Sequence, residues 1–200
     1  MTTNFCDWLA GEISFTKTEL NSGDYLFRQD DPADAIYGLT DGIICLLRTT
    51  AAGQTAVLFR AHAGDCIAEA SLQADKYHCF AFCETRVSVK RFSSHVVRDK
   101  LAADSNFASE WAARLARQVR DLRSLVECLH YPKAKDRIYH YLLSQADAQG
   151  KVALTGSQKT LASILGITHE SLYRTLKVLE AQAVIKRDDS RSMITIIGKY

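Results

Sequence analysis

The sequence predicts an α+β chain with a β-rich first part, a long helix in the middle and a winged helix-turn-helix at the end. Up to about residue 92, short apolar runs alternate with turn residues, which is typical of strands. Residues 94–130 contain no Gly or Pro and favour a helix. The remaining residues show helical patterns followed by a hairpin pattern. We therefore expect three parts, at residues 1–93, 94–130 and 131–200.

Charge is divided unevenly along the chain. The 200 residues have a net charge of +2, with 47% hydrophobic and 24% charged residues, which is typical of a globular protein and excludes a disordered or fibrous one. Residues 1–130 carry 14 Lys+Arg and 17 Asp+Glu, a net charge of −3, whereas residues 131–200 carry 11 and 6, a net charge of +5. This division favours two modules, the second of which meets a polyanion.

The first part is expected to be a small antiparallel sandwich or barrel. Turn signals that include Gly23 and Gly42 separate apolar runs at residues 25–27, 43–47 and 56–59. Short strands at this spacing are typical of such folds.

The predicted helix at 94–130 carries an apolar seam. Its members are separated alternately by four and three residues, and they are Ala108, Ala112, Leu115, Val119, Leu122, Val126 and Leu129. β-Branched residues at one heptad position and Leu at the other favour a parallel two-stranded coiled coil. We therefore expect a homodimer. The alternative is a helix packed only on its own domain, which usually has a wider and less regular stripe.

Tyr131-Pro132 marks a domain boundary, because proline cannot continue a helix interior. We expect a further helix from about residue 134 to 148, ended by Gly150, and then a short strand at 151–154.

Residues 157–181 carry the strongest motif. A small residue, Ala162, stands where two helices would touch, Gly166 suits a sharp turn, and Leu172 would lock the second helix against the first. Thr168 is a good N-cap for that second helix. This spacing indicates a helix-turn-helix, and residues 184–196 are expected to form a hairpin, or wing.

The outward face of the second helix is expected to read DNA bases through four side chains: His169, Glu170, Tyr173 and Arg174. A Glu accepts a hydrogen bond from cytosine N4, and an Arg binds guanine O6 and N7 in two-pronged fashion. The alternative is a surface salt bridge between Glu170 and Arg174, which are four residues apart.

Other polar residues are expected to contact DNA phosphates, which fixes the register without reading sequence. They are Ser157, Gln158, Lys159, Lys177, Lys186, Arg187 and Arg191. The alternative for each is a solvated charged surface.

From about residue 12 to the end, the chain resembles the CRP/FNR superfamily, the regulators related to the cyclic-AMP receptor protein. The matching stretches are Gly23-Asp24, Gly42, residues 64–72 (GDCIAEASL) and residues 168–174 (THESLYR). The resemblance implies a cyclic-nucleotide-binding-like β-roll, a long dimerisation helix and a winged helix. It also implies a homodimer on a palindromic operator with a TGA-like core, and contact with RNA polymerase.

The effector segment departs from the family pattern. Cyclic-nucleotide binders have a Gly-Glu pair followed about ten residues later by an Arg that binds the cyclic phosphate. Here Ala68 precedes Glu69, and the segment 76–81 (KYHCFA) has no Arg. We therefore predict that cyclic AMP is not the effector. An unknown small molecule, anionic if Lys76 or Arg123 substitutes for the missing Arg, remains a candidate. The pocket residues are expected to be Glu69, Ser71, Lys76, His78, Cys79, Leu122 and Arg123.

No cofactor or metal is predicted. His78 and Cys79 would point to opposite faces of a strand, and Cys79 and Cys83 would lie roughly 13 Å apart. Cys66, Cys79 and Cys83 leave three interpretations open: plain core residues, thiol redox or nitrosative sensing, or a metal site that Cys66 completes from a neighbouring turn. An iron–sulfur cluster is not expected, because Cys6 is alone near the N-terminus.

The sequence offers little support for an enzyme, because it has no Ser/His/Asp arrangement, no phosphate-binding glycine loop and no paired C-x-x-C. No signal peptide or membrane helix is visible, so we expect a cytoplasmic protein with reduced thiols.

The alternative to a DNA-binding regulator is a ligand-binding or protein-interaction module whose winged helix does not read DNA.

Overall fold

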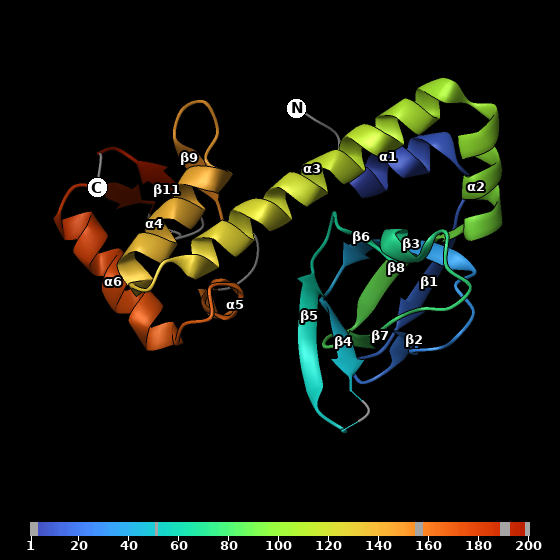
Figure 1. The fold of residues 1–200 in the computed structure, drawn as a ribbon, viewed down its shortest axis with the longest axis horizontal. Coiled ribbons are helices and arrows are strands. Elements are labelled where there is room, and N and C mark those ends of the chain that lie inside the picture. The colour runs from blue at the N-terminus through green and yellow to red at the C-terminus, as the bar shows by residue number, and fades with distance from the viewer. Residues whose placement is uncertain (1–3, 51, 155–157, 189–192, 199–200) are drawn as a thin grey trace. The chain divides into compact units, whose positions relative to one another are not determined.

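The computed structural model describes residues 4–50, 52–154, 158–188 and 193–198. The chain divides into two compact units, Met1–Ala112 and Ala113–Tyr200. Figure 1 shows the β-rich unit, the long helix α3 and the helical unit with its small sheet. The predicted α+β class is confirmed.

The first unit is built on two four-stranded antiparallel sheets. One has the order β1-β8-β3-β6 and the other the order β2-β7-β4-β5. The strands are β1 (Thr16–Leu20), β2 (Tyr25–Phe27), β3 (Ala35–Asp41), β4 (Ile44–Thr49), β5 (Thr55–Ala61), β6 (Cys66–Ile67), β7 (Phe80–Cys83) and β8 (Val87–Ser93). Inward side chains of both sheets form one core, in which Phe27 stacks on Tyr77 with ring centroids 3.9 Å apart. The predicted strand runs are therefore confirmed.

A short N-terminal helix, α1 (Phe5–Glu12), precedes the strands and was not predicted. The Asn4 side chain caps it by accepting a hydrogen bond from the Asp7 amide at 2.8 Å. Its buried residues are Cys6 and Leu9, a face too short to give a helical periodicity in the sequence. Trp8 of α1 stacks on Phe107 with ring centroids 4.9 Å apart.

Gly38 in β3 makes room for α1. A Cβ at this position would lie 2.1 Å from Sγ of Cys6, well inside van der Waals contact. We expect Gly38→Ala to lower the free energy of unfolding of this unit by about 1–3 kcal/mol, because overpacking a filled core forces atoms apart. Removing the Cys6 sulfur in the double variant Gly38→Ala/Cys6→Ala should recover much of that loss. Urea denaturation of both variants and of Cys6→Ala measures the coupling, and strictly additive losses would contradict this account.

The expected single helix over 94–130 is two helices, α2 (Ser94–Ala103) and α3 (Ser105–His130). Asp104 between them has an extended backbone, with φ −124° and ψ 102°. Its carboxylate accepts hydrogen bonds from the amides of Asn106 and Phe107, both at 3.0 Å. Asp is a strong N-cap, and its side chain competes with helix continuation. The prediction of one uninterrupted helix was therefore wrong.

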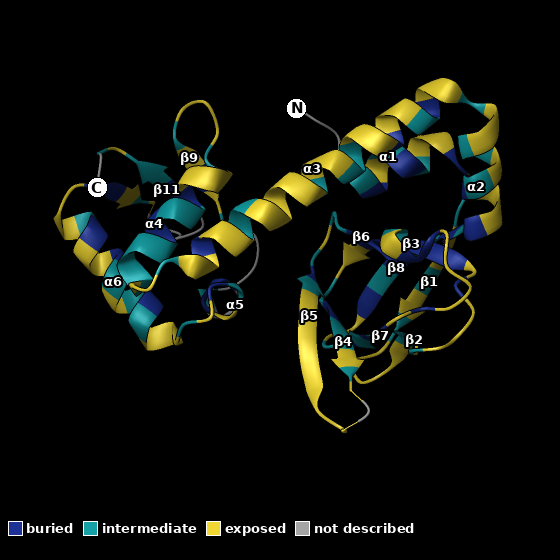
Figure 2. Ribbon diagram, viewed as in Figure 1, coloured by how far each residue is buried: buried dark blue, intermediate teal, exposed yellow. Residues whose placement is uncertain are grey.

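The buried residues of helix α3 lie near its start and near its end, and the stretch between them is exposed or half-buried (Figure 2). Phe107 and Trp111 are buried near its start, and Cys128 is buried near its end. In contrast, the predicted seam includes four large apolar side chains that are 42–60% exposed: Val119, Leu122, Val126 and Leu129. Packing on its own domain therefore does not cover this stripe.

The second unit has the elements of a winged helix-turn-helix. They are α4 (Ala134–Gln145), β9 (Lys151–Ala153), α5 (Gln158–Ile164), α6 (His169–Ala181), β10 (Ile185–Arg187) and β11 (Met193–Ile196). The sheet order is β10-β11-β9, and all pairs are antiparallel. No helix in the described ranges is long and apolar enough to cross a membrane.

Helix α4 ends three residues earlier than predicted, and Gly150 does not end it. Ala146 is already extended, with ψ 138°. The Asp147 carboxylate then accepts hydrogen bonds from the amides of Gln149 and Lys151, at 2.9 and 2.8 Å. Gly150, with φ 74°, serves the turn into β9.

Candidate nucleic-acid interface

One face of α6 is fixed in the core of its unit. Leu172, Leu176 and Leu179 are fully buried, at positions that recur once per helical turn. Thr168 caps the helix, since its hydroxyl accepts a hydrogen bond from the Ser171 amide at 3.1 Å. Because three buried leucines hold one face, the opposite face must point to solvent. This confirms the predicted helix bounds and cap.

The opposite face of α6 carries the side chains predicted to read bases. His169, Glu170 and Arg174 are exposed, and Tyr173 is half-buried. Lys177 is also exposed, and its ammonium lies 4.7 Å from the centroid of the Tyr173 ring. No salt bridge joins Glu170 to Arg174 in the part of the chain that the structure describes. Within the described residues, the Glu170 carboxylate and the Arg174 guanidinium are therefore not paired with each other.

The turn before α6 is held by a residue that sequence reasoning missed. Gly166 has φ 61°, a left-handed conformation that glycine adopts readily. Arg137 of α4 donates to the Leu165 carbonyl at 2.8 Å, and it also donates to the Tyr131 carbonyl at 3.0 Å. Arg137 thus ties the turn to the segment that follows α3. A single basic residue in a helix gives no sequence signal for this role.

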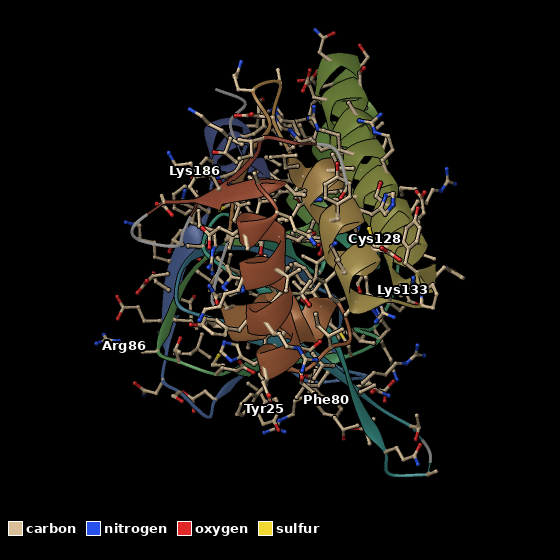
Figure 3. All side chains as sticks on the ribbon, turned by 90° about the vertical axis from the view of Figure 1, so that its left-hand side faces the viewer. Tyr25, Phe80, Arg86, Cys128, Lys133 and Lys186 are labelled. Carbon is tan, nitrogen blue, oxygen red and sulfur yellow. The ribbon has the colours of Figure 1, made fainter. Side chains whose placement is uncertain are left out.

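Among the residues predicted to contact phosphate, Gln158 is half-buried at the start of α5, and Lys186 is exposed on β10 (Figure 3). Lys177 joins them on the exposed face of α6. Ser157, Arg191 and the side chain of Lys159 lie outside the described residues.

The structure does not support the phosphate contact predicted for Arg187. Its side chain is only 7% exposed and forms a salt bridge with Glu180 near the end of α6. Nε and Nη2 of Arg187 donate to Oε2 of Glu180 at 3.1 and 2.5 Å. The guanidinium is therefore engaged inside the domain, where it fastens β10 to α6. The sequence could not show this pairing, because it depends on how the hairpin returns alongside α6.

The predicted effector residues fall into both units. A short 3₁₀ helix, η1 (Glu69–Ser71), places Ser71 in a buried position with its hydroxyl 3.2 Å from Nδ1 of His78. Cys79 is buried and His78 is exposed, but both lie in a bend before β7, which begins at Phe80 and not at residue 78 as the prediction assumed. Lys76 is exposed and pairs with Pro32 in an isolated bridge. Leu122 and Arg123 are exposed on α3, in the second unit.

Ala68, which precedes η1, adopts a conformation that favours glycine. Its φ of 71° and ψ of 8° are left-handed, and such a conformation costs an L-residue roughly 1–2 kcal/mol. We expect Ala68→Gly to raise the free energy of unfolding of the first unit by about 0.5–1 kcal/mol, since relief of strain exceeds the added entropy of the unfolded chain. A urea melt measures it. The matched control is Ala116→Gly on the exposed surface of α3, which should destabilise, and a loss of stability in both variants would contradict the prediction.

The six cysteines are all free and buried. Burial raises the pKa of the Cys79 and Cys83 thiols above the usual value, and it raises the pKa of Cys66 strongly. Within the described ranges, no group of three His, Cys, Asp or Glu residues is arranged to hold a metal ion.

Two family models match this chain. Residues 17–104 match the cyclic nucleotide-binding domain, and residues 136–198 match the Crp-like helix-turn-helix domain. The second match contains the whole of α6 and the wing strands described above.

Individual proteins agree with these models. The chain is 26% identical over 179 residues to the nitrogen fixation regulation protein FixK of Azorhizobium caulinodans, covering 84% of this chain and 71% of that protein. It shares the fold of FixK2 from Bradyrhizobium japonicum, with a TM-score of 0.67, 20% identity and coverage of 92% and 93%. It also shares the fold of the c-di-GMP-responsive regulator CLP of Xanthomonas campestris, with a TM-score of 0.57, 19% identity and coverage of 92% and 95%.

Proposed function

Because this chain belongs to the CRP/FNR family of DNA-binding transcription regulators, which are not enzymes, we propose that it acts as a homodimer on a two-fold symmetric operator. The observation that carries the proposal is the exposed face of α6, where Glu170 and Arg174 stand one turn apart and are not paired with each other. Glu accepts a hydrogen bond from cytosine N4, and Arg binds guanine through two hydrogen bonds, so together they suit a core like TGA. His169 and Tyr173 complete the base-reading face.

Phosphate contacts are proposed for the residues that flank this face. Lys177 and Lys186 are exposed, and Gln158 lies at the start of α5. Ser157, Lys159 and Arg191 are retained from the sequence as further candidates, whereas Arg187 is not. The net charge of +5 on residues 131–200 supports an approach to the polyanionic backbone.

The proposed homodimer is held by the seam of α3. Val119 and Val126 occupy one heptad position, and Leu122 and Leu129 occupy the other. These side chains are exposed in the single chain, which supports the α3 helix of a second copy as the surface that buries them. In this reading, residues 1–93 sense, residues 94–130 dimerise and residues 131–200 bind DNA. A dimer also matches a palindromic operator with half-sites about one DNA turn apart.

The direct test is fluorescence anisotropy with a labelled duplex that carries two TGA-like half-sites, against a duplex of the same composition with shuffled half-sites. We expect tight binding to the first, and binding that weakens steeply with salt, because each phosphate contact releases counterions. Equal affinity for both duplexes would show that the winged helix does not read sequence.

We propose that the effector is not cyclic AMP. In cyclic-nucleotide binders an Arg follows the Glu by about ten residues. At about that position this chain has Cys79, which is buried, next to His78, which is exposed. A lost charge-assisted hydrogen bond costs roughly 1.5–3 kcal/mol, which corresponds to about ten- to a hundredfold in affinity. Either Lys76 or Arg123, each exposed in its own unit, is proposed to supply the positive charge for a different anionic effector. Glu69, Ser71 and Leu122 are retained from the sequence as candidate effector residues.

Calorimetric titration of the full-length protein with cyclic AMP tests this proposal. We expect no saturable heat at micromolar concentrations of the nucleotide. Saturable micromolar binding, or cyclic AMP retained by the purified protein and detected by mass spectrometry, would overturn it. Cyclic GMP and c-di-GMP serve as comparison ligands in the same titration.

Two further elements of the proposal follow from family membership. A regulator of this kind acts on RNA polymerase, so we propose contact with the polymerase at the promoter. We also propose a cytoplasmic location, because a DNA-binding regulator acts where the DNA is, and thiols are kept reduced there by default.

A further inference from the structure

Cys6 and Cys66, which are sixty positions apart in the chain, both lie next to Gly38. Sγ of Cys6 on α1 lies 2.1 Å from the point where a Cβ of Gly38 would stand, and Cβ of Cys6 lies 2.9 Å from that point. Gly38 in β3 is the register partner of Cys66 in the antiparallel strand β6. Cys6 is 1% exposed and Cys66 is 6% exposed.

The register places the two sulfurs on the same face of the sheet. Directly opposed residues of an antiparallel pair have Cβ atoms about 4.5–5.5 Å apart, and the pairs without hydrogen bonds are the closer ones. Leu39 donates its amide hydrogen bond to the Asp65 carbonyl at 2.9 Å, so the adjacent pair of Gly38 and Cys66 is of the closer kind. The Cys6 sulfur therefore stands where a cross-strand neighbour of Cys66 would be.

The alternation of the core agrees with this placement. Tyr37 and Ile67, the next pair along, face the core between the two sheets. Gly38 and Cys66 must then face the other side, where α1 packs. The two thiols also interact electrostatically, since the charge of Cys6 is one of the causes that raise the pKa of Cys66.

We propose that Cys6 and Cys66 form a dithiol that a peroxide oxidises to an intramolecular disulfide, which fastens α1 to the edge strand β6. This site goes beyond the proposed function and does not depend on it. Disulfide geometry needs Cβ atoms roughly 3.5–4.5 Å apart. The Cys6 side chain occupies the place where a Cβ of Gly38 would stand, and Gly38 is directly opposite Cys66. A small movement of α1 can therefore bring Cys6 and Cys66 to this separation.

Cys6 is the attacking residue in this scheme. Burial raises the pKa of its thiol, but the Lys90 ammonium opposes that effect, whereas the pKa of Cys66 is raised well above its usual value. The Cys6 thiolate attacks one peroxide oxygen, the O–O bond breaks and hydroxide leaves, which gives a sulfenic acid. The Cys66 sulfur then attacks the Cys6 sulfur, the S–O bond breaks and water leaves. Two thiols and hydrogen peroxide thus give one disulfide and two waters.

The disulfide would fix more than one contact. Helix α1 also packs Trp8 against Phe107 and Phe5 against Trp111, the buried residues at the start of α3. Closing a loop of this length restricts the unfolded chain, so oxidation should raise the unfolding midpoint of the first unit. Trp8, two residues from Cys6 on the same helix, gives a fluorescence readout of the same change.

The test is peptide mapping of the full-length native protein. The protein is treated with hydrogen peroxide, its remaining thiols are alkylated and the digest is analysed by mass spectrometry. We expect one cross-linked species that joins the Cys6 and Cys66 peptides, two hydrogens lighter than the reduced pair, and its loss on treatment with dithiothreitol. No such species, or only sulfinic acid at Cys6, would overturn the proposal.

Variants check the pairing and the fold together. Cys6→Ser and Cys66→Ser should each abolish the cross-link and the rise in unfolding midpoint on oxidation. Cys45→Ser is the matched control, because Cys45 is also buried in the first unit but lies on β4. A midpoint that rises on oxidation in Cys6→Ser as well would assign the effect to another pair and contradict the proposal. The wild-type map needs no variant, so it decides even if a variant does not fold.

Discussion

Arg174→Ala should remove specific operator binding. Each two-pronged contact between an Arg and a guanine contributes about 1–3 kcal/mol of base discrimination. A homodimer makes this contact twice, so the loss is roughly 2–6 kcal/mol, or on the order of thirty- to ten-thousandfold in affinity. Arg174 is exposed on α6, away from the leucines that hold the helix, so the variant should keep the fold. Anisotropy with the palindromic duplex measures the effect.

The matched control is Arg86→Ala, which removes an equal charge from a side chain that is 74% exposed on the β domain (Figure 3). It should leave operator affinity within about twofold of the wild type. A second control replaces guanine by 7-deazaguanine in each half-site, which should weaken the wild type and have little further effect on Arg174→Ala. If both protein variants bind equally well, Arg174 does not read DNA and α6 serves another partner.

Leu122→Glu should convert the protein to a monomer. Leu122 is 60% exposed in the single chain, so the substitution should cost the fold little. In a dimer, it would remove two buried Leu side chains at roughly 1.5–3 kcal/mol each and bring two carboxylates together. We expect the dissociation constant of the dimer to rise on the order of a thousandfold or more. Sedimentation velocity measures this change.

Arg120→Glu is the matched control, because Arg120 is exposed on the same helix but lies outside the seam. It should leave the wild-type dimer intact. Affinity for the palindromic duplex should fall in Leu122→Glu but not in the control, because one subunit grips only one half-site. A Leu122→Glu protein that still sediments as a dimer would place the interface elsewhere.

The helix-turn-helix was predictable because its signals are local. The apolar spacing of Leu172, Leu176 and Leu179, the cap at Thr168 and the turn at Gly166 all lie within fifteen residues. Each is a property of the backbone or of one helix turn, so the sequence shows it directly. The same is true of the α3 seam, whose residues repeat at heptad spacing.

The features that the sequence did not reveal depend on contacts between distant segments. Helix α1 is stable because it covers Gly38 and meets Phe107, neither of which is near it in the chain. Arg187 was assigned to phosphate because a basic residue in a wing is usually solvated, yet the hairpin returns it to Glu180. The break at Asp104 is local, but one capping residue inside a helix-forming stretch is a weak signal.

On the proposed function, a dimer of this chain reads a two-fold symmetric DNA sequence with the exposed face of α6. Selection of bound duplexes from a randomised pool by the full-length protein tests it most directly. We expect enrichment of an inverted repeat with TGA-like half-sites about one helical turn apart, and loss of that enrichment with Arg174→Ala. Recovery of no sequence, or of a single asymmetric motif, would contradict it.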